Sequence, residues 1–271
     1  MDSLNAFGSA SYPSYEFWVI NIFIGCLGLI WGSFFNVCIA RIPDRKSLLT
    51  RSACPKCEAT IPWFANIPVL SFLYLKARCL KCKNPISIQY PLVELATAVI
   101  FLGLFHQYGL SWQFLSYTIL ASNLLVISVI DLYLQIIPDE LSLSGSVVGF
   151  LLSFLTQDIL WWESLLGILS GGGSFLLVAV LYEKVSKREG LGGGDIKLLA
   201  MIGAWLGYKA ILPTIIVSSA LGSVVGIVLI LFKGRDFKSA IPFGPFLAVG
   251  ALVYLFWGKS IDSLLFVGEN L

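Results

Sequence analysis

Long apolar stretches recur along this chain, and they restrict its possible folds more than any other feature. Of its 271 residues, 57% are hydrophobic and 13% are charged, and the mean hydropathy is +0.86, a balance too apolar for a soluble domain of this length. A helix needs about 20 apolar residues to cross a bilayer. We therefore predict an all-α, polytopic transmembrane helical bundle of about eight spans. The expected spans are residues 17–38, 92–108, 112–130, 141–156, 163–182, 196–208, 211–232 and 241–257.

Basic residues are concentrated in alternate loops between these spans. Sixteen of the eighteen Lys and Arg residues lie in 41–91, 183–197 or 233–238. An eight-span arrangement places the three loops on one side of the membrane, and the positive-inside rule makes that side cytoplasmic. Both termini then face outward. The N-terminal region has no basic stretch before its apolar one, so we do not expect a removable signal peptide.

One loop is large enough to form a domain of its own. Residues 41–91 are polar and carry cysteines and prolines, whereas the other connections are short, as in a helical bundle. We therefore divide the chain into a first transmembrane span (1–40), a cytoplasmic insert (41–91) and a transmembrane bundle (92–271).

The insert contains two CxxC pairs, Cys54 with Cys57 and Cys79 with Cys82, separated by 21 residues. This spacing is near that of a zinc ribbon, in which four thiolates complete the tetrahedral shell of a structural Zn²⁺. The alternatives are a pair of disulfides or cysteines that only pack. A cytoplasmic location disfavours lasting disulfides, so we predict a small zinc-ribbon-like insert.

The other cysteines and the single histidine carry no comparable pattern. Cys26 and Cys38 fall within the first span, where we expect packing. His106 lies near an outward helix end without ligand-like neighbours. It excludes a His–nucleophile pair on the cytoplasmic side, including a serine triad.

Acidic residues in or beside the spans are functional candidates, because burying their charge is expensive. Asp131 ends an apolar run near the cytoplasmic end of the third span, and Asp195 opens the sixth span after a glycine-rich loop. We place both at the same depth on the same side. Two adjacent carboxyl groups share one proton, so that one can act as base toward water and the other as acid. Such a pair can hydrolyse an amide without metal or histidine.

Ordinary explanations exist for each of these acids. Asp195 could cap a helix and pair with Lys197, and Asp131 could be an interfacial residue at a span end. Asp139 follows Pro138 and reads as the cap of the fourth span. The glycines at 190–194 are not a phosphate loop, because no Gly-Lys-Ser/Thr follows them.

Several short motifs occur together in this sequence. They are Gly32-Ser33-Phe34-Phe35-Asn36-Val37, Arg41-Ile42-Pro43, the two CxxC pairs, Asn66-Ile67-Pro68, Tyr90-Pro91-Leu92-Val93-Glu94, Asp131 with Ile137-Pro138-Asp139, and Gly192-Gly193-Gly194-Asp195. Over roughly residues 25–250 the chain resembles type IV prepilin peptidases, whose GxGD signature the last motif fits.

That resemblance implies a bifunctional enzyme of the bacterial inner membrane. It would cleave the basic leader of prepilins or pseudopilins at the cytoplasmic face and then N-methylate the new N-terminus with S-adenosylmethionine. It assigns catalysis to Asp131 and Asp195, a supporting loop to Gly192 and Gly194, and makes Glu94 a candidate for methyl transfer. The implied partners are pilin-like substrates and membrane lipid, with no nucleic acid.

Two departures bear on methyl transfer, since Ala98 and Ala77 stand where many relatives carry glycine. The alternatives kept open are a peptidase without methyl transfer and an ion-coupled transporter that uses the intramembrane carboxylates as a relay. A third is a zinc-ribbon scaffold without catalysis, which leaves the two aspartates unexplained.

Overall fold

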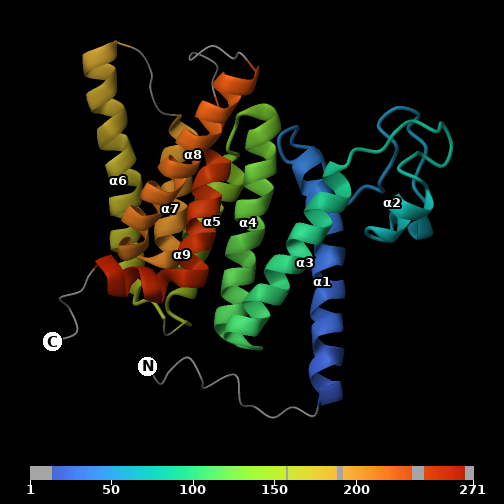
Figure 1. Cartoon of the computed structure of the whole chain (residues 1–271), viewed down its shortest axis with the longest axis horizontal. Helices are drawn as coiled ribbons and strands as arrows, with labels where there is room; N and C mark the ends of the chain where they lie inside the picture. Colours follow the sequence, from blue (N-terminus) through green and yellow to red (C-terminus); the bar gives the residue numbers. More distant parts are fainter. Residues whose placement is uncertain (1–13, 157, 188–191, 234–240, 266–271) are drawn as a thin grey trace. The chain divides into compact units, whose positions relative to one another are not determined.

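The computed structural model describes residues 14–156, 158–187, 192–233 and 241–265, most of them helical (Figure 1). Within these ranges β-structure is limited to two isolated bridges in the insert. The helical elements in chain order are α1 (Ser14–Arg41), η1 (Trp63–Asn66), α2 (Leu70–Tyr74), α3 (Gln89–Tyr108), α4 (Trp112–Leu134), α5 (Asp139–Leu152), α6 (Trp161–Ser186), α7 (Gly193–Leu206), η2 (Tyr208–Ala210), α8 (Ile211–Lys233) and α9 (Gly244–Leu265).

Six of the described helices are long and apolar enough to cross a membrane: α1, α3, α4, α6, α8 and α9. The predicted all-α polytopic bundle is thus confirmed. Helices also form at the two remaining expected spans, but α5 and α7 have only 14 residues each. At 1.5 Å per residue they are about 21 Å long, shorter than the hydrocarbon core of about 30 Å. The expected number of eight spans is therefore approximate.

The chain forms two compact units, Met1–Thr118 and Ile119–Leu271. In the first, α1 packs along α3. A Cβ at Gly28 would lie 2.6 Å from the Cα of Ala98, and one at Gly32 would lie 2.6 Å from the Cα of Glu94. Only glycine allows this approach, so the small residues of α1 set the distance between the two helices.

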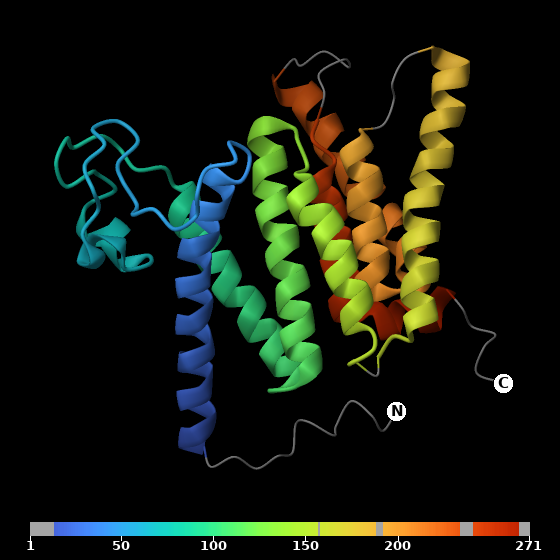
Figure 2. The same cartoon turned by 180° about the vertical axis from the view of Figure 1, so that it is seen from behind.

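In the second unit, α7 packs against both α5 and α6, and α8 packs against α9 (Figure 2). Gly167 of α6 faces Gly203 of α7 so closely that a Cβ on either would collide with the other's backbone. Glycine at positions 167 and 203 therefore allows α6 and α7 to pack closely. All of α7 from Leu198 to Leu206 except Ala200 is buried, which holds the start of this short helix in a fixed place.

Candidate functional site

Asp131 lies in the last turn of α4 and is buried. Its Oδ2 accepts a hydrogen bond of 2.9 Å from the backbone N–H of Gly244, the first residue of α9. The amino terminus of a helix carries a partial positive charge, so this contact stabilises a negative charge on Asp131. A Cβ at Gly244 would lie 2.7 Å from the same oxygen. Glycine is therefore required at position 244 for the carboxylate to reach the backbone.

Asp195 is the third residue of α7 and is half-buried. Gly192 is the N-cap, and its carbonyl accepts the Asp195 N–H at 3.0 Å. A Cβ at Gly194 would lie 2.9 Å from the Cβ of Ile137, so the start of α7 is packed against the segment between α4 and α5. Gly190 and Leu191 of the glycine loop lie outside the described residues.

The two carboxyl groups influence one another. Burial first and the negative charge of Asp131 second raise the pKa of Asp195 to about 6, against the lowering effect of a hydrogen bond from the Gly192 backbone. The carboxyl of Asp195 thus keeps its proton to a higher pH than an ordinary aspartate. The pair is therefore unsymmetrical: Asp131 is bound by the N-terminus of α9, and Asp195 has the raised pKa.

The ordinary explanation for Asp195 is wrong. Gly192, not Asp195, caps α7, and Lys197 binds Asp139 instead, with Nζ 2.6 Å from Oδ1. The expected cap role of Asp139 is also wrong, because Pro138 occupies the N-cap of α5. Asp139 instead ties the first turn of α5 to α7, so its charge is used in a surface ion pair.

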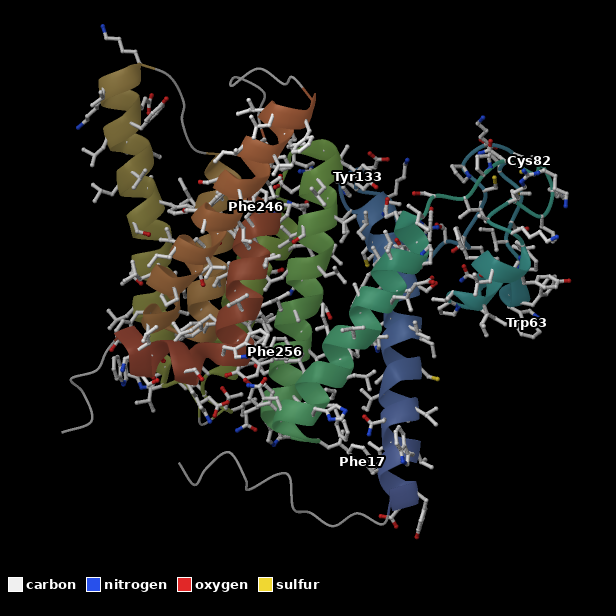
Figure 3. The ribbon with its side chains drawn as sticks, in the orientation of Figure 1. Phe17, Trp63, Cys82, Tyr133, Phe246 and Phe256 are labelled. Atoms are coloured by element: carbon white, nitrogen blue, oxygen red, sulfur yellow. The ribbon has the colours of Figure 1, made fainter. Side chains whose placement is uncertain are left out.

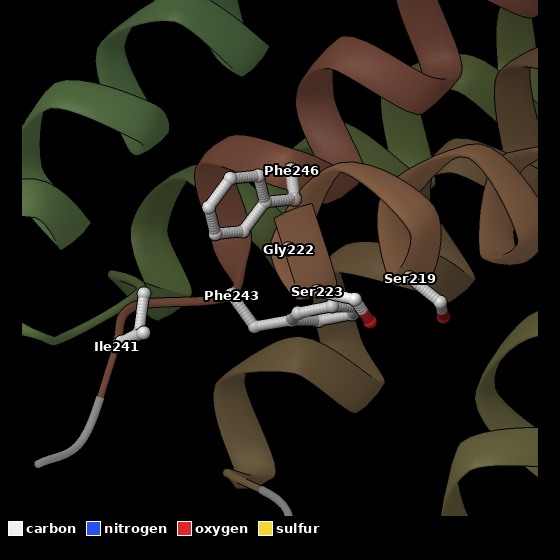
Figure 4. A pocket seen from close by; sticks show the side chains of 6 residues that line it. All are labelled: Ser219, Gly222, Ser223, Ile241, Phe243 and Phe246. Carbon is white, nitrogen blue, oxygen red and sulfur yellow. The ribbon is translucent and has the colours of Figure 1, made fainter. Parts of the chain in front are cut away.

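A groove of about 330 Å³ opens between α8 and the start of α9 (Figure 4). Its apolar wall includes Phe243, which directly precedes the Gly244 that binds Asp131. Phe243 also packs against Phe175 of α6, with ring centroids 6.2 Å apart. On α8 the groove is lined by small residues. The complete lining is Ser219, Gly222, Ser223, Ile241, Phe243 and Phe246.

The four cysteines of the insert come together as predicted. Their sulfur atoms lie within 4.8 Å of one another, and the Cys54 and Cys82 sulfurs are 3.8 Å apart. All four are free thiols, so the disulfide alternative is not what this structure holds. A tetrahedral zinc site with metal–sulfur bonds of about 2.3 Å has sulfur–sulfur edges of about 3.8 Å. The cluster therefore fits a four-thiolate metal site.

Each CxxC pair forms the same tight turn. Cys54 N–H donates to the Ala59 carbonyl, and Cys79 N–H donates to the Asn84 carbonyl. Hydrogen bonds from the backbone of Cys57 and then Lys56 lower the pKa of Cys54 to about 6. The backbone of Cys82 likewise lowers the pKa of Cys79. Thiolates are the form that binds metal, so the turns prepare the Cys54 and Cys79 sulfurs for a cation. At Cys82, a backbone hydrogen bond from Asn84 lowers the pKa, but burial and the other cysteines outweigh it and raise the pKa to about 11.

Cys26, Cys38 and His106 lie outside the cysteine cluster and the aspartate site. Cys38 is buried, as expected, but Cys26 is exposed on α1, so the packing prediction was wrong for Cys26. His106 Nε2 lies 2.7 Å from Oδ1 of Asn21, so the imidazole forms a hydrogen bond between α3 and α1.

Glu94 is buried on α3, and its Oε2 accepts the N–H of Val69 at 2.7 Å. Val69 is β-branched yet has φ of 59°, a left-handed conformation that costs free energy. Glu94 thus holds a strained turn of the insert. Asn36 lies on α1, one helical turn after the Gly32 that packs against Glu94. It is also buried, and its Oδ1 has no hydrogen-bond partner among the described residues. Together these groups offer hydrogen-bond acceptors suited to a cationic ligand.

Comparison with known proteins places these residues in a family. Residues 26–108 match the bacterial peptidase A24 N-terminal domain, and residues 118–227 match the type IV leader peptidase family. A prepilin leader peptidase/N-methyltransferase of Myxococcus xanthus is 39% identical, covering 83% of this chain and 68% of the relative. Proteins of the same name from Xanthomonas campestris and Pseudomonas aeruginosa are 36% and 35% identical, each covering 87% of this chain and 90% and 89% of the relative. The chain belongs to the type IV leader peptidase family. No solved structure is significantly similar to it.

Sequence reasoning missed Gly244, whose backbone N–H binds the candidate site residue Asp131. A signal was present, because Pro245 follows it, and proline favours the first turn of a helix. A glycine before such a proline marks a helix N-terminus with free N–H groups. The motif did not indicate which carboxylate would bind there.

Proposed function

We propose that this chain is a bifunctional aspartyl endopeptidase and N-methyltransferase of the bacterial inner membrane, acting on prepilins or pseudopilins. The observation that carries the proposal is the unsymmetrical carboxyl pair of Asp131 and Asp195. Membership of the leader peptidase family, whose relatives are named for both activities, supports it.

The peptidase step follows from the environments of the two acids. The Asp131 carboxylate, held by the Gly244 N–H, takes a proton from a water molecule. The water oxygen attacks the scissile carbonyl carbon while the Asp195 carboxylic acid donates its proton to the carbonyl oxygen. Collapse of the tetrahedral intermediate breaks the C–N bond, and the proton on Asp131 passes to the leaving amine. The hydroxyl proton then returns to Asp195, which restores the pair.

The groove beside Phe243 gives the substrate a place next to this pair. Side chains flanking the scissile bond would enter the groove, while the small residues of α8 let an apolar helix approach. The basic loops support a cytoplasmic position for the site, because Asp195 lies in the basic segment 183–197, which the positive-inside rule assigns to the cytoplasm. A leader junction at that interface would meet the pair without crossing the membrane.

Zn²⁺ in this proposal has a structural role. Cys54, Cys57, Cys79 and Cys82 would hold it with no coordination position left for water. The insert 41–91 is then a metal-stabilised domain between the first span (1–40) and the peptidase bundle (92–271).

For the second activity, S-adenosylmethionine supplies a methyl group activated by a positive sulfonium. We assign to Glu94 the binding of the cationic methyl donor or of the substrate amine. Asn36 Oδ1, which has no partner among the described residues, would accept a further hydrogen bond from this ligand. Glu94→Gln tests this, because a glutamine oxygen can still accept the Val69 N–H but carries no charge. Mass spectrometry should show trimmed but unmethylated pilin. Full methylation by this variant would limit Glu94 to its structural contact.

The peptidase proposal is tested by Asp131→Asn and Asp195→Asn, assayed on a pilin-like substrate in membranes. Each should reduce leader cleavage by at least about 1000-fold while the protein stays in the membrane. The matched control is Asp139→Asn, which removes a surface ion pair and should leave cleavage within about threefold. Retained cleavage in either of the first two variants would contradict the assignment.

A further inference from the structure

The insert exposes a set of large apolar side chains that the cysteine cluster does not use. We call these five residues the apolar face: Trp63, Phe64, Leu70, Leu73 and Tyr74. Trp63 and Tyr74 are each 80% exposed, and Leu70 and Leu73 are 64% and 65% exposed. Leu70, Leu73 and Tyr74 share one side of α2 by their spacing, and α2 packs on η1. An apolar patch this exposed on a polar domain marks a binding surface.

The apolar face lies at the level of the transmembrane helices. Val69, directly before α2, is bound to Glu94, the sixth residue of α3. Five residues along a helix correspond to about 7.5 Å, so α2 begins beside the second turn of a candidate span instead of beyond its end. Both cartoon views show α2 alongside α1 and α3 (Figures 1 and 2).

The two ends of the insert differ in the direction they face. Figure 3 shows Trp63 at the end of the insert nearer the level of Phe17, near the start of α1, and Cys82 at the opposite end. Trp63 therefore lies on the side of the insert that faces the same way as the start of α1, and Cys82 lies on the opposite side.

The net positive charge of the insert favours an anionic partner for the apolar face. Residues 41–91 contain nine Lys and Arg but only two acidic residues, Asp44 and Glu58. Lys76 and Arg78 follow α2 immediately, and both are exposed. An anionic lipid surface attracts such a domain, whereas a basic peptide would be repelled. Exposed Trp and Tyr are also the aromatic residues enriched at membrane interfaces.

We propose that the apolar face is an interfacial anchor that inserts into the anionic leaflet around α1 and α3. Trp63, Phe64, Leu70, Leu73 and Tyr74 enter the boundary between headgroups and acyl chains, and the neighbouring basic side chains bind lipid headgroups. The anchor holds the cysteine cluster at a fixed height above the membrane. This inference rests on the polytopic membrane fold and is independent of the proposed catalysis.

The test uses the full chain in nanodiscs with and without lipids brominated on their acyl chains, which quench tryptophan on contact. The chain has eight tryptophans, so the Trp63 signal is the difference between the wild type and Trp63→Phe. We expect bromolipid to remove more than about half of that signal, and more in anionic than in zwitterionic discs. The double variant Trp63→Phe, Leu80→Trp places a reporter between Cys79 and Cys82 and should not be quenched.

A second variant separates anchoring from folding. Leu73→Glu changes an exposed side chain, so the insert should still fold and bind zinc while the Trp63 quenching is lost. Trp63 that is unquenched by bromolipid but open to acrylamide would overturn the proposal, because the face would then lie in water. Trp63 shielded from both quenchers would also overturn it, because protein would then cover the face. Equal quenching in the two kinds of disc would overturn the preference for anionic lipid.

Discussion

The insert and the aspartate site both hold a few side chains in place, but the insert does so with almost no core. Between residues 42 and 90, Cys54 is the only buried residue. Around Asp195, by contrast, α7 is buried almost without interruption from Leu198 to Leu206 and is packed on neighbouring helices through glycine contacts. A region without a core needs a cross-link such as a metal, whereas a packed bundle needs exact spacing of its backbones.

This contrast predicts that the two regions fail independently. Changes at the sulfurs should unfold the insert and leave the bundle intact. Changes at close glycine contacts should displace the carboxyl pair and leave the insert intact.

The largest effect is expected from removing the metal. Chelation, or Cys54→Ser with Cys82→Ser, should unfold residues 52–86, because four thiols without a cation cannot replace a core. Hydrogen exchange with mass spectrometry should show loss of protection there and unchanged protection in α6 and α7. Metal-free protein with a protected insert would refute the structural role of zinc.

Next in size is Gly244→Ala. The added Cβ would lie 2.7 Å from Oδ2 of Asp131, so the carboxylate must move away from the helix N-terminus. A displacement of about 1 Å at a catalytic group can cost about 100-fold, and we expect that loss in kcat for leader cleavage.

The control for this change is Gly173→Ala, because a Cβ there meets nothing within 4 Å. It should leave kcat unchanged. Equal activity of the two alanine variants would show that the Gly244 contact does not position Asp131.

A smaller loss is expected when the groove is filled. Gly222→Trp should place a ring among Phe243, Phe246 and Ser219 and raise KM for the pilin substrate by about tenfold. Gly222→Ala is the matched control, since its Cβ would meet Phe246 at 3.5 Å, an ordinary contact. A tryptophan variant with unchanged KM would mean that substrate does not use the groove.

The dependence of kcat/KM on pH tests the carboxyl pair in the unmutated protein. Because the pKa of Asp195 is raised to about 6, the acid is protonated below that pH and loses its proton as pH rises through it. We therefore expect kcat/KM to fall about fivefold between pH 6 and pH 7. Recovery on return to pH 6 separates titration from denaturation. A constant kcat/KM between pH 6 and pH 8 would contradict the assigned acid.

The smallest effect is expected in the insert. Ala77 has φ of 56°, a left-handed conformation that glycine adopts without strain. Ala77→Gly should stabilise the folded insert by about 0.5–1 kcal/mol and tighten zinc binding about two- to fivefold. Ala59→Gly, at a position without positive φ, should weaken binding instead.

Several features of this protein could be predicted from its sequence. The apolar stretches indicated a polytopic helical bundle, and the spacing of Cys54, Cys57, Cys79 and Cys82 predicted the cluster that the structure contains. The bundle could be predicted because it depends on total hydrophobicity, and the cluster could be predicted because two CxxC pairs supply the four thiolates that one Zn²⁺ binds. Hydrophobicity alone did not predict the number of spans, because α5 and α7 are apolar but have only 14 residues each.

Only the tertiary structure decided which distant groups meet. Gly244 and Asp131 are 113 residues apart, Lys197 and Asp139 are 58 apart, and Val69 and Glu94 are 25 apart. Asp195 is two residues before Lys197 on α7, so the two side chains face different sides of that helix, but the local sequence does not indicate that Asp139 is the partner of Lys197. Helix packing and the direction of each side chain select the partner, and those are properties of the folded chain.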